Sequence, residues 1–140
     1  MDSLAAAALA TLQLQQVECS AQTLSATAWS LATLRISHRP LMAAIADNAV
    51  PLSAQFSPRQ ISSTAWSFAR LKISHVPLLK AIAACALTPI SDYKERPWLR
   101  KRQAPTLLAA FRPAELSNTV WACATLEFLD RQLLDAVAAE

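Results

Sequence analysis

A repeated stretch constrains the fold of this chain more than any other feature of its sequence. SATAWSLATLRISHRPLMAAIA at 25–46 recurs as SSTAWSFARLKISHVPLLKAIA at 62–83, an offset of 37 residues. A third copy follows, with its tryptophan 55 residues after the second, 18 more than the period. The copies share a tryptophan, a serine four residues before it and a threonine two residues before it: Trp29, Trp66 and Trp121, Ser25, Ser62 and Ser117, Thr27, Thr64 and Thr119.

Each copy has the spacing of two amphipathic helices. Counted from the tryptophan, alanine stands at +3 and leucine at +5, followed by leucine at +12 and isoleucine or valine at +16, which are helical intervals. Pro40 and Pro77 suit the first turn of each second helix, because proline interrupts a helix interior but fits its start. Caps such as SPRQ at 57–60 predict that the first helices begin near residues 20, 57 and 113.

The repeat predicts an all-α fold. One helical hairpin cannot bury its apolar face alone, whereas stacked hairpins share a continuous core. We therefore expect an α-solenoid of about three hairpins in a single domain. The predicted units are a lone helix over 3–16, repeats over 19–50, 56–87 and 111–140, and an insertion over 88–110.

Composition agrees with a helical fold and excludes several classes of site. The chain of 140 residues has no glycine, so P-loops and glycine-rich dinucleotide turns cannot form in their usual way. Hydrophobic residues make up 54% and charged residues 16%, which excludes a disordered chain. Alanine and leucine dominate, and alternating strand patterns are missing.

Two residue types are expected in the core. We expect the three tryptophans to pack between repeats, because they recur at helical spacing among Ala and Leu; the alternative is that they form platforms for stacked bases. Cys19, Cys85 and Cys123 are widely spaced, with no CxxC pair, and are expected to be small buried apolar groups in a reducing compartment.

The insertion over 88–110 is the first candidate binding segment. It interleaves basic and aromatic side chains on a stretch broken by prolines, a composition that suits phosphates and unstacked bases. The alternative is a solvated structural loop. The candidate RNA contacts here are Lys94, Arg96, Trp98, Arg100, Lys101 and Arg102.

Charge is distributed unevenly along the chain. Residues 19–112 hold 12 Lys and Arg against 3 Asp and Glu, a local net charge of +9, while the flanks hold 1 against 7. The overall net charge of +3 hides this basic middle. A positive potential over stacked hairpins attracts polyanions, and single-stranded RNA is the polyanion that helical repeats commonly read.

The first helix of each repeat presents a variable polar set. Positions −3, +4 and +6 from the tryptophan hold Ala26, Ser63 and Asn118, Thr33, Arg70 and Thr125, and Arg35, Lys72 and Glu127. Polar and basic groups at fixed repeat positions are what a reader of one base per repeat needs, so Arg35, Arg70, Lys72, Ser63 and Asn118 are further candidate RNA contacts. The alternative is an ordinary exposed helix face, with Ser and Thr at −4 and −2 bonding backbone carbonyls.

The sequence predicts no catalytic or metal site. His38 and His75 occupy equivalent positions, where the third copy has Asp130. They lack further ligands at workable spacing for a metal, and are expected to be turn residues or RNA contacts. With no nucleophile triad or paired carboxylates, we expect a protein that is not an enzyme and binds no cofactor.

The ends of the chain carry no targeting or membrane signal. Asp2 stands where a secretory peptide has basic residues. No apolar stretch approaches the roughly 20 residues that a membrane span requires. The sequence predicts a soluble protein without a transit peptide.

The motifs TLSATAWSLATLRI (23–36), QISSTAWSFARLKI (60–73) and ELSNTVWACATLEF (115–128) resemble those of organellar helical-repeat proteins. These are the octotricopeptide repeats, the related repeats of FAST-kinase-like and RAP-domain proteins, and the helical repeats of RNA-editing substrate-binding complex proteins. The resemblance covers residues 19–140 apart from the insertion. It implies an α-solenoid that binds RNA in a mitochondrion or chloroplast and acts in RNA stability, processing, editing or translation; without a transit peptide, the cytoplasm is the other expectation.

Two functions are therefore expected from the sequence. The first is binding of single-stranded RNA, alone or with other proteins of a ribonucleoprotein complex. The second is a protein-interaction scaffold, a solenoid segment of a larger assembly. Three hairpins that each read about one base cover about three nucleotides, so we expect a longer parent chain, an oligomer or a partner to supply further contacts.

Overall fold

The protein is all-helical over the residues that its structure, a computed structural model, describes: 2–13, 19–87 and 110–139. These ranges contain seven α-helices, one short 3-10 helix and no strand, which confirms the all-α prediction. The α-helices are α1 (Asp2–Gln13), α2 (Ala21–Thr33), α3 (Arg39–Leu52), α4 (Pro58–Arg70), α5 (Val76–Leu87), α6 (Pro113–Thr125) and α7 (Arg131–Ala139).

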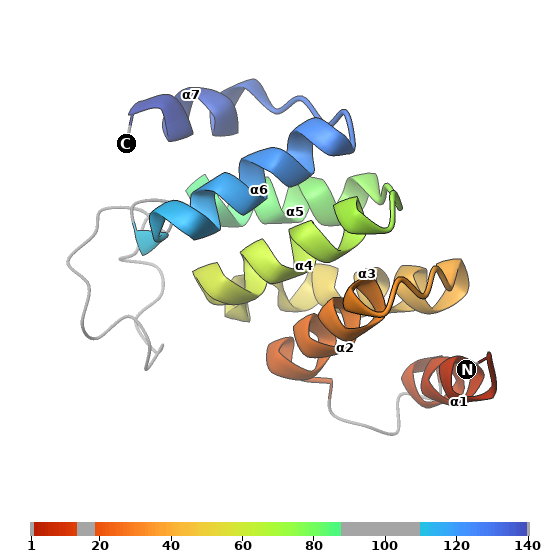
Figure 1. The fold of residues 1–140 in the computed structure, drawn as a ribbon. Helices are drawn as coiled ribbons and strands as arrows, with labels where there is room; N and C mark the ends of the chain where they lie inside the picture. The colour runs from red at the N-terminus through yellow and green to blue at the C-terminus, as the bar shows by residue number, and fades with distance from the viewer. Residues whose placement is uncertain (1, 14–18, 88–109, 140) are drawn as a thin grey trace.

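The helices stack in two rows, as expected of a solenoid-like fold (Figure 1). Helix α4 packs against α2 on one side and α6 on the other, and we call these three helices the A row. Behind them, α3 packs against α1 and α5, and α5 against α7, and we call these four the B row. In Figure 1 the chain begins at one end of the stack with α1 and ends at the other with α7.

The predicted start signals act where the sequence places them. Ser57 Oγ accepts a hydrogen bond from the Gln60 N–H (3.3 Å), and Gln60 Oε1 accepts one from the Ser57 N–H (2.9 Å). This reciprocal capping box satisfies two backbone donors at the start of α4. Helices α3 and α5 each begin one residue before the predicted proline.

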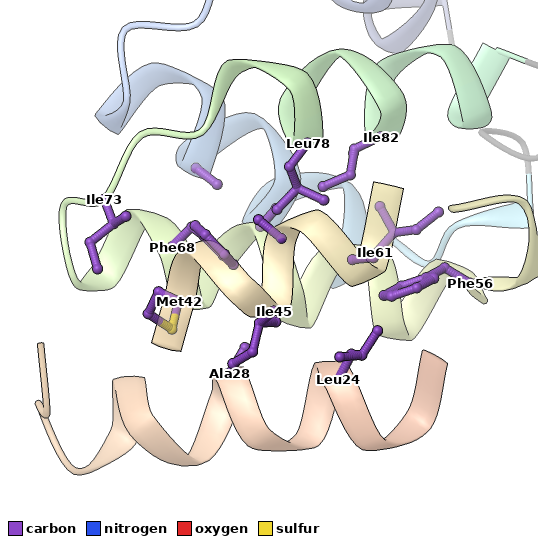
Figure 2. Packing of buried hydrophobic residues seen from close by; sticks show 14 of the residues in the cluster. Leu24, Ala28, Met42, Ile45, Phe56, Ile61, Phe68, Ile73, Leu78 and Ile82 are labelled. Carbon is purple, nitrogen blue, oxygen red and sulfur yellow. The ribbon is translucent and has the colours of Figure 1, made fainter. Parts of the chain in front are cut away.

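The core lies between the two rows (Figure 2). Ala28 of α2 lies beside Ile45 of α3, Leu24 of α2 points toward Phe56, and Phe68 of α4 is 1% exposed in the same cluster. The core side chains of the A row, such as Leu24 and Phe68, stand five residues before or two residues after the tryptophan of their repeat. At 100° per residue both positions lie on the side of the helix opposite the tryptophan. A second cluster around Cys123 and Leu133 joins α5, α6 and α7.

Neighbouring A-row helices contact each other through small side chains. Ser25, Ala28 and Ala32 of α2 are buried, as are the equivalent Ser62, Ala65 and Ala69 of α4. In α6, which has no later A-row helix beside it in the described chain, Ser117 and Ala124 at the same positions are exposed. Burial of this side therefore depends on the next helix in the row, and small residues let the backbones approach closely.

The expectation that the tryptophans form the repeat-to-repeat core is wrong. Trp29 is 50% exposed and Trp121 44% exposed, and Trp66 is only partly buried. The physical reason is the close contact through Ala and Ser, which leaves no room between A-row helices for an indole. The tryptophan position faces away from the core, which is filled by residues such as Leu24, Ile61 and Phe68.

The cysteine prediction agrees with the structure for Cys85 and Cys123, which are 6% and 4% exposed, while Cys19 is half-buried and packs against the main cluster. Burial raises the pKa of the Cys123 thiol, and the nearby Asp130 carboxylate raises it further. The thiol form is therefore favoured at neutral pH, which suits a packed apolar group better than a nucleophile or metal ligand.

His38, His75 and Asp130 have one shared role, the N-cap of a B-row helix. The Nδ1 atoms of His38 and His75 accept hydrogen bonds from the N–H groups of Leu41 (3.1 Å) and Leu78 (3.2 Å), and Asp130 Oδ1 accepts one from Leu133 (2.9 Å). Because Nδ1 of His75 accepts, its proton lies on Nε2, which donates to Asp47 Oδ1 at 3.2 Å. Aspartate can replace histidine here because both offer an acceptor three residues before the bonded amide.

This shared role gives a test at His38. His38→Ala removes the acceptor for the Leu41 N–H and should lower the free energy of unfolding by about 1 kcal/mol. His38→Asp should keep most of the wild-type stability, since aspartate caps α7 in this chain. Urea unfolding of the two variants decides between them, and equal destabilisation by Asp and Ala would contradict the capping role.

Candidate RNA-binding groove on the A row

A surface groove of ≈ 690 Å³ runs across the A row. It lies over the tryptophan position and the N-terminal halves of the three helices, and we call it the A-row groove. Ten of its fourteen lining residues are of polar type, two of them arginines, and two more are tryptophans: Gln22, Ser25, Ala26, Trp29, Ser57, Arg59, Gln60, Ser62, Ser63, Trp66, Arg112, Ala114, Glu115 and Asn118.

The groove follows from one helical face repeated three times. Positions −7, −3, 0 and +4 from the tryptophan fall within about 60° of one another at 100° per residue. On α4 these positions are Arg59, Ser63, Trp66 and Arg70, and all four are exposed or partly exposed. Because the A-row helices lie side by side, the equivalent faces of α2 and α6 extend the same surface.

Hydrogen bonds hold the groove in one shape. Gln60 Nε2 donates to Gln22 Oε1 at 3.0 Å, which joins α4 to α2 across the groove. The same Gln60 side chain accepts from the Ser57 backbone in the capping box. The amide is thereby fixed at both ends, so the wall that carries Trp29 and Trp66 is organised before any ligand binds.

The charged groups in the groove favour an anion. Arg59 and Arg112 line it, against one acid, Glu115. Glu115 Oε2 accepts a hydrogen bond from the Arg112 backbone N–H at 2.7 Å, so it also serves as the cap of α6. Within the described part of the chain no Lys or Arg side chain lies at salt-bridge distance from an acid, and the one contact of that length joins the His75 imidazole to Asp47. Neither guanidinium is therefore paired with an acid there.

The structure brings together two of the predicted RNA contacts. Ser63 and Asn118 line the groove, next to Ala26 at the equivalent position of α2. Arg70 is exposed on the same face of α4, one turn beyond Trp66. The remaining predicted contacts, Lys94, Arg96, Trp98, Arg100, Lys101 and Arg102, lie outside the described residues, so their prediction stays open.

Arg35 and Lys72 lie apart from the groove lining, in the turns that end α2 and α4. With Glu127 they adopt left-handed backbone angles, with φ of 57°, 55° and 54°. The next residue closes each turn: the N–H groups of Ile36 and Ile73 bond the carbonyls of Leu31 and Phe68, both at 2.9 Å. This is the Schellman arrangement, in which glycine is the usual left-handed residue.

Non-glycine residues at these three turns cost stability. A left-handed backbone brings the Cβ close to the following carbonyl, at about 1–2 kcal/mol for each residue. A lysine or arginine near a helix C-terminus gains a smaller amount from the helix dipole, about 0.3–1 kcal/mol. The left-handed residue therefore lowers stability relative to glycine in all three copies, and because Glu127 shares the conformation, it does not mark Arg35 and Lys72 as ligand contacts. The prediction that these two residues contact RNA stays open.

Neither a metal-ligand cluster nor a membrane-spanning helix is found in the described residues. They contain no cluster of three or more His, Cys, Asp and Glu side chains that could hold a metal ion. Over the same ranges, no helix combines the length and apolar character needed to cross a bilayer.

Sequence reasoning missed several groove residues. It assigned the tryptophans to the core and did not consider the −7 position, where Gln22, Arg59 and Ala114 vary between copies. The helical spacing that groups −7 with −3 and +4 was a signal for this surface. No helical spacing indicated that Arg112 lines the groove, because this residue precedes α6 and its place in the lining depends on how the three helices pack.

Comparisons with protein-family models, with curated proteins and with solved structures found no match to this chain. The assignment of a function therefore depends on the groove and on the motifs of the repeat.

The left-handed turn after α4 can be tested at Lys72. Lys72→Gly should raise the free energy of unfolding by about 1 kcal/mol, since glycine adopts this backbone without a Cβ clash. Lys72→Ala removes the same charge but keeps the clash, so it should lower the free energy of unfolding by the lost dipole interaction, about 0.3–1 kcal/mol. Thermal unfolding of both variants is the measurement, and equal effects of Gly and Ala would contradict the cost of the backbone conformation.

Proposed function

We propose that this protein binds single-stranded RNA in the A-row groove. The observation that carries the proposal is that three neighbouring helices and their caps bring indoles, guanidinium groups and small polar side chains to one surface, with no salt bridge to either guanidinium from the residues that the structure describes. Positive groups attract phosphates, aromatic rings accept unstacked bases, and hydroxyl and amide groups such as those of Ser63 and Asn118 can bond base edges.

The choice of RNA and the cellular context come from the resemblance to organellar helical-repeat proteins. On this proposal the protein acts in RNA processing, stability, editing or translation in a mitochondrion or chloroplast, and catalyses no reaction itself. The basic insertion, which joins the chain just before the groove residue Arg112, adds cationic groups that extend the contact with the RNA backbone.

The cationic contribution can be measured through salt dependence. Each neutralised phosphate of a single strand contributes about −0.7 to the slope of log K against log salt concentration. If Arg59 and Arg112 each contact a phosphate, the double variant Arg59→Glu/Arg112→Glu should reduce the magnitude of the slope by about 1.4 and weaken binding of a short single-stranded RNA. Fluorescence anisotropy at several salt concentrations gives both quantities.

A matched control separates local contact from net charge. Arg39→Glu/Arg131→Glu makes the same change in net charge at the first residues of α3 and α7, in the B row. It should keep nearly the wild-type slope, because these residues lie outside the groove lining. Equal weakening by the two double variants would contradict binding in the groove, and a flat slope for the wild type would contradict RNA binding as such. Charge reversal at Arg100, Lys101 and Arg102 tests the insertion separately.

A protein-interaction scaffold is the second candidate function, and the free sides of the A row favour it. Pro113, Ser117 and Ala124 of α6 are exposed, although the equivalent residues of α2 and α4 are buried by the next helix. At the other end, Ser30 of α2 and its C-cap residue Leu34 are exposed, although the equivalent Ser67 is 0% exposed and Leu71 is partly buried. The outer sides of α2 and α6 therefore carry residues at the repeat positions through which the A-row helices pack against one another.

The scaffold function predicts partners that persist without RNA. Ser117→Arg/Ala124→Arg places two bulky cations on the free side of α6, where nothing in the described chain packs, so the fold should be retained. If a partner docks there, its capture after nuclease treatment should be lost in this variant and kept in Arg59→Glu/Arg112→Glu. Capture that disappears with nuclease treatment of the wild type contradicts the scaffold function.

A further inference from the structure

The three tryptophans are the least explained feature of the surface. The A-row helices pack through Ser and Ala, and the core is complete without the indoles. Trp29 and Trp121 expose about half of their surface, 50% and 44%. Trp66, at the equivalent position of α4, is partly buried between them. Large aromatic side chains that recur on the outward face and lie outside the core cluster mark a candidate binding surface.

From the outward location of the tryptophans we infer that the indoles are stacking platforms, each holding one unstacked base of a single strand. The inference rests on the proposed RNA-binding function and deepens it, because it names the part of the nucleotide that each side chain holds. Trp29 and Trp66 line the A-row groove together, and Trp121 continues the row on the outer face of α6.

The spacing of the platforms decides which form of nucleic acid fits. Packed helices have axes about 8–10 Å apart, so equivalent residues of α2 and α4 recur at about that interval. Consecutive bases in a double helix rise by about 3.4 Å. Two neighbouring bases therefore cannot occupy neighbouring platforms while they stay stacked on each other. The row accepts an extended single strand and excludes a duplex.

The rest of the groove is arranged to complement a stacked base. Ser63 and Asn118 stand one turn before Trp66 and Trp121, at the edge of each platform, while Arg59 lies two turns before Trp66. The ring face thus contributes affinity without regard to base identity, since every base has a π-face. The guanidinium groups serve the phosphates, so loss of an indole and loss of an arginine should have different signatures.

The test compares two ligands with the same backbone charge. One is a fluorescein-labelled decauridylate, and the other is a ribose-phosphate decamer of equal length without bases. Trp29→Leu and Trp66→Leu should each weaken decauridylate binding by about 5- to 150-fold, the range expected for one stacked base. Both variants should bind the abasic decamer as the wild type does, and Trp29→Phe and Trp66→Phe should keep most of the affinity for decauridylate.

A second readout does not depend on the stability of the leucine variants. In a Trp98→Phe chain, Trp29, Trp66 and Trp121 are the remaining tryptophans. Decauridylate should quench their emission at saturation, and the abasic decamer and a ten-base-pair RNA duplex should not.

The outcomes separate this inference from the proposed function. Equal losses for decauridylate and the abasic decamer, or unchanged indole emission at saturating decauridylate, would overturn stacking while leaving RNA binding intact. Wild-type protein that binds neither ligand at low salt would overturn both. Quenching by decauridylate alone, with a loss confined to the base-bearing ligand, would establish the platforms.

Discussion

Close packing between the A-row helices is the interaction on which the rest of the structure depends. Ala28 and Ala32 of α2 and Ala65 and Ala69 of α4 are at most 1% exposed, and their small side chains allow neighbouring backbones to approach closely. The central helix α4 then has two sides against its neighbours and one against the core, where large residues such as Phe68 pack. The remaining side faces outward, and every copy of the repeat has its tryptophan there.

This constraint connects the fold to the groove. Because the contacts between helices recur at the same positions, the outward faces of α2, α4 and α6 align and form one continuous surface. The Gln60–Gln22 hydrogen bond and the Ser57 capping box then fix the relative placement of two of these faces. A ligand that spans neighbouring helices meets groups that are already in position, so little ordering of side chains opposes its binding.

The turns that connect each A-row helix to the next B-row helix combine a conformation that lowers stability with a cap that raises it. A chain without glycine ends α2, α4 and α6 with left-handed Arg35, Lys72 and Glu127, and begins the following helices with His38, His75 or Asp130 as the cap. The first choice costs stability, and the second recovers some of it by satisfying a backbone donor. Together they make each connection short enough to bring the B-row helix back against the core.

Local patterns were sufficient to predict the helices and most of their boundaries, because helical spacing, proline positions and caps such as Ser57 act over a few neighbouring residues. The sequence also determined that Ser63 and Asn118 recur at one repeat position. It could not determine which side of an alanine-rich helix faces inward, because alanine fits both a close helix contact and an exposed face, as Ala28 and Ala26 show. Only the tertiary structure decided that the indoles lie outside and that Arg112 joins Arg59, since both results depend on how closely three helices approach one another.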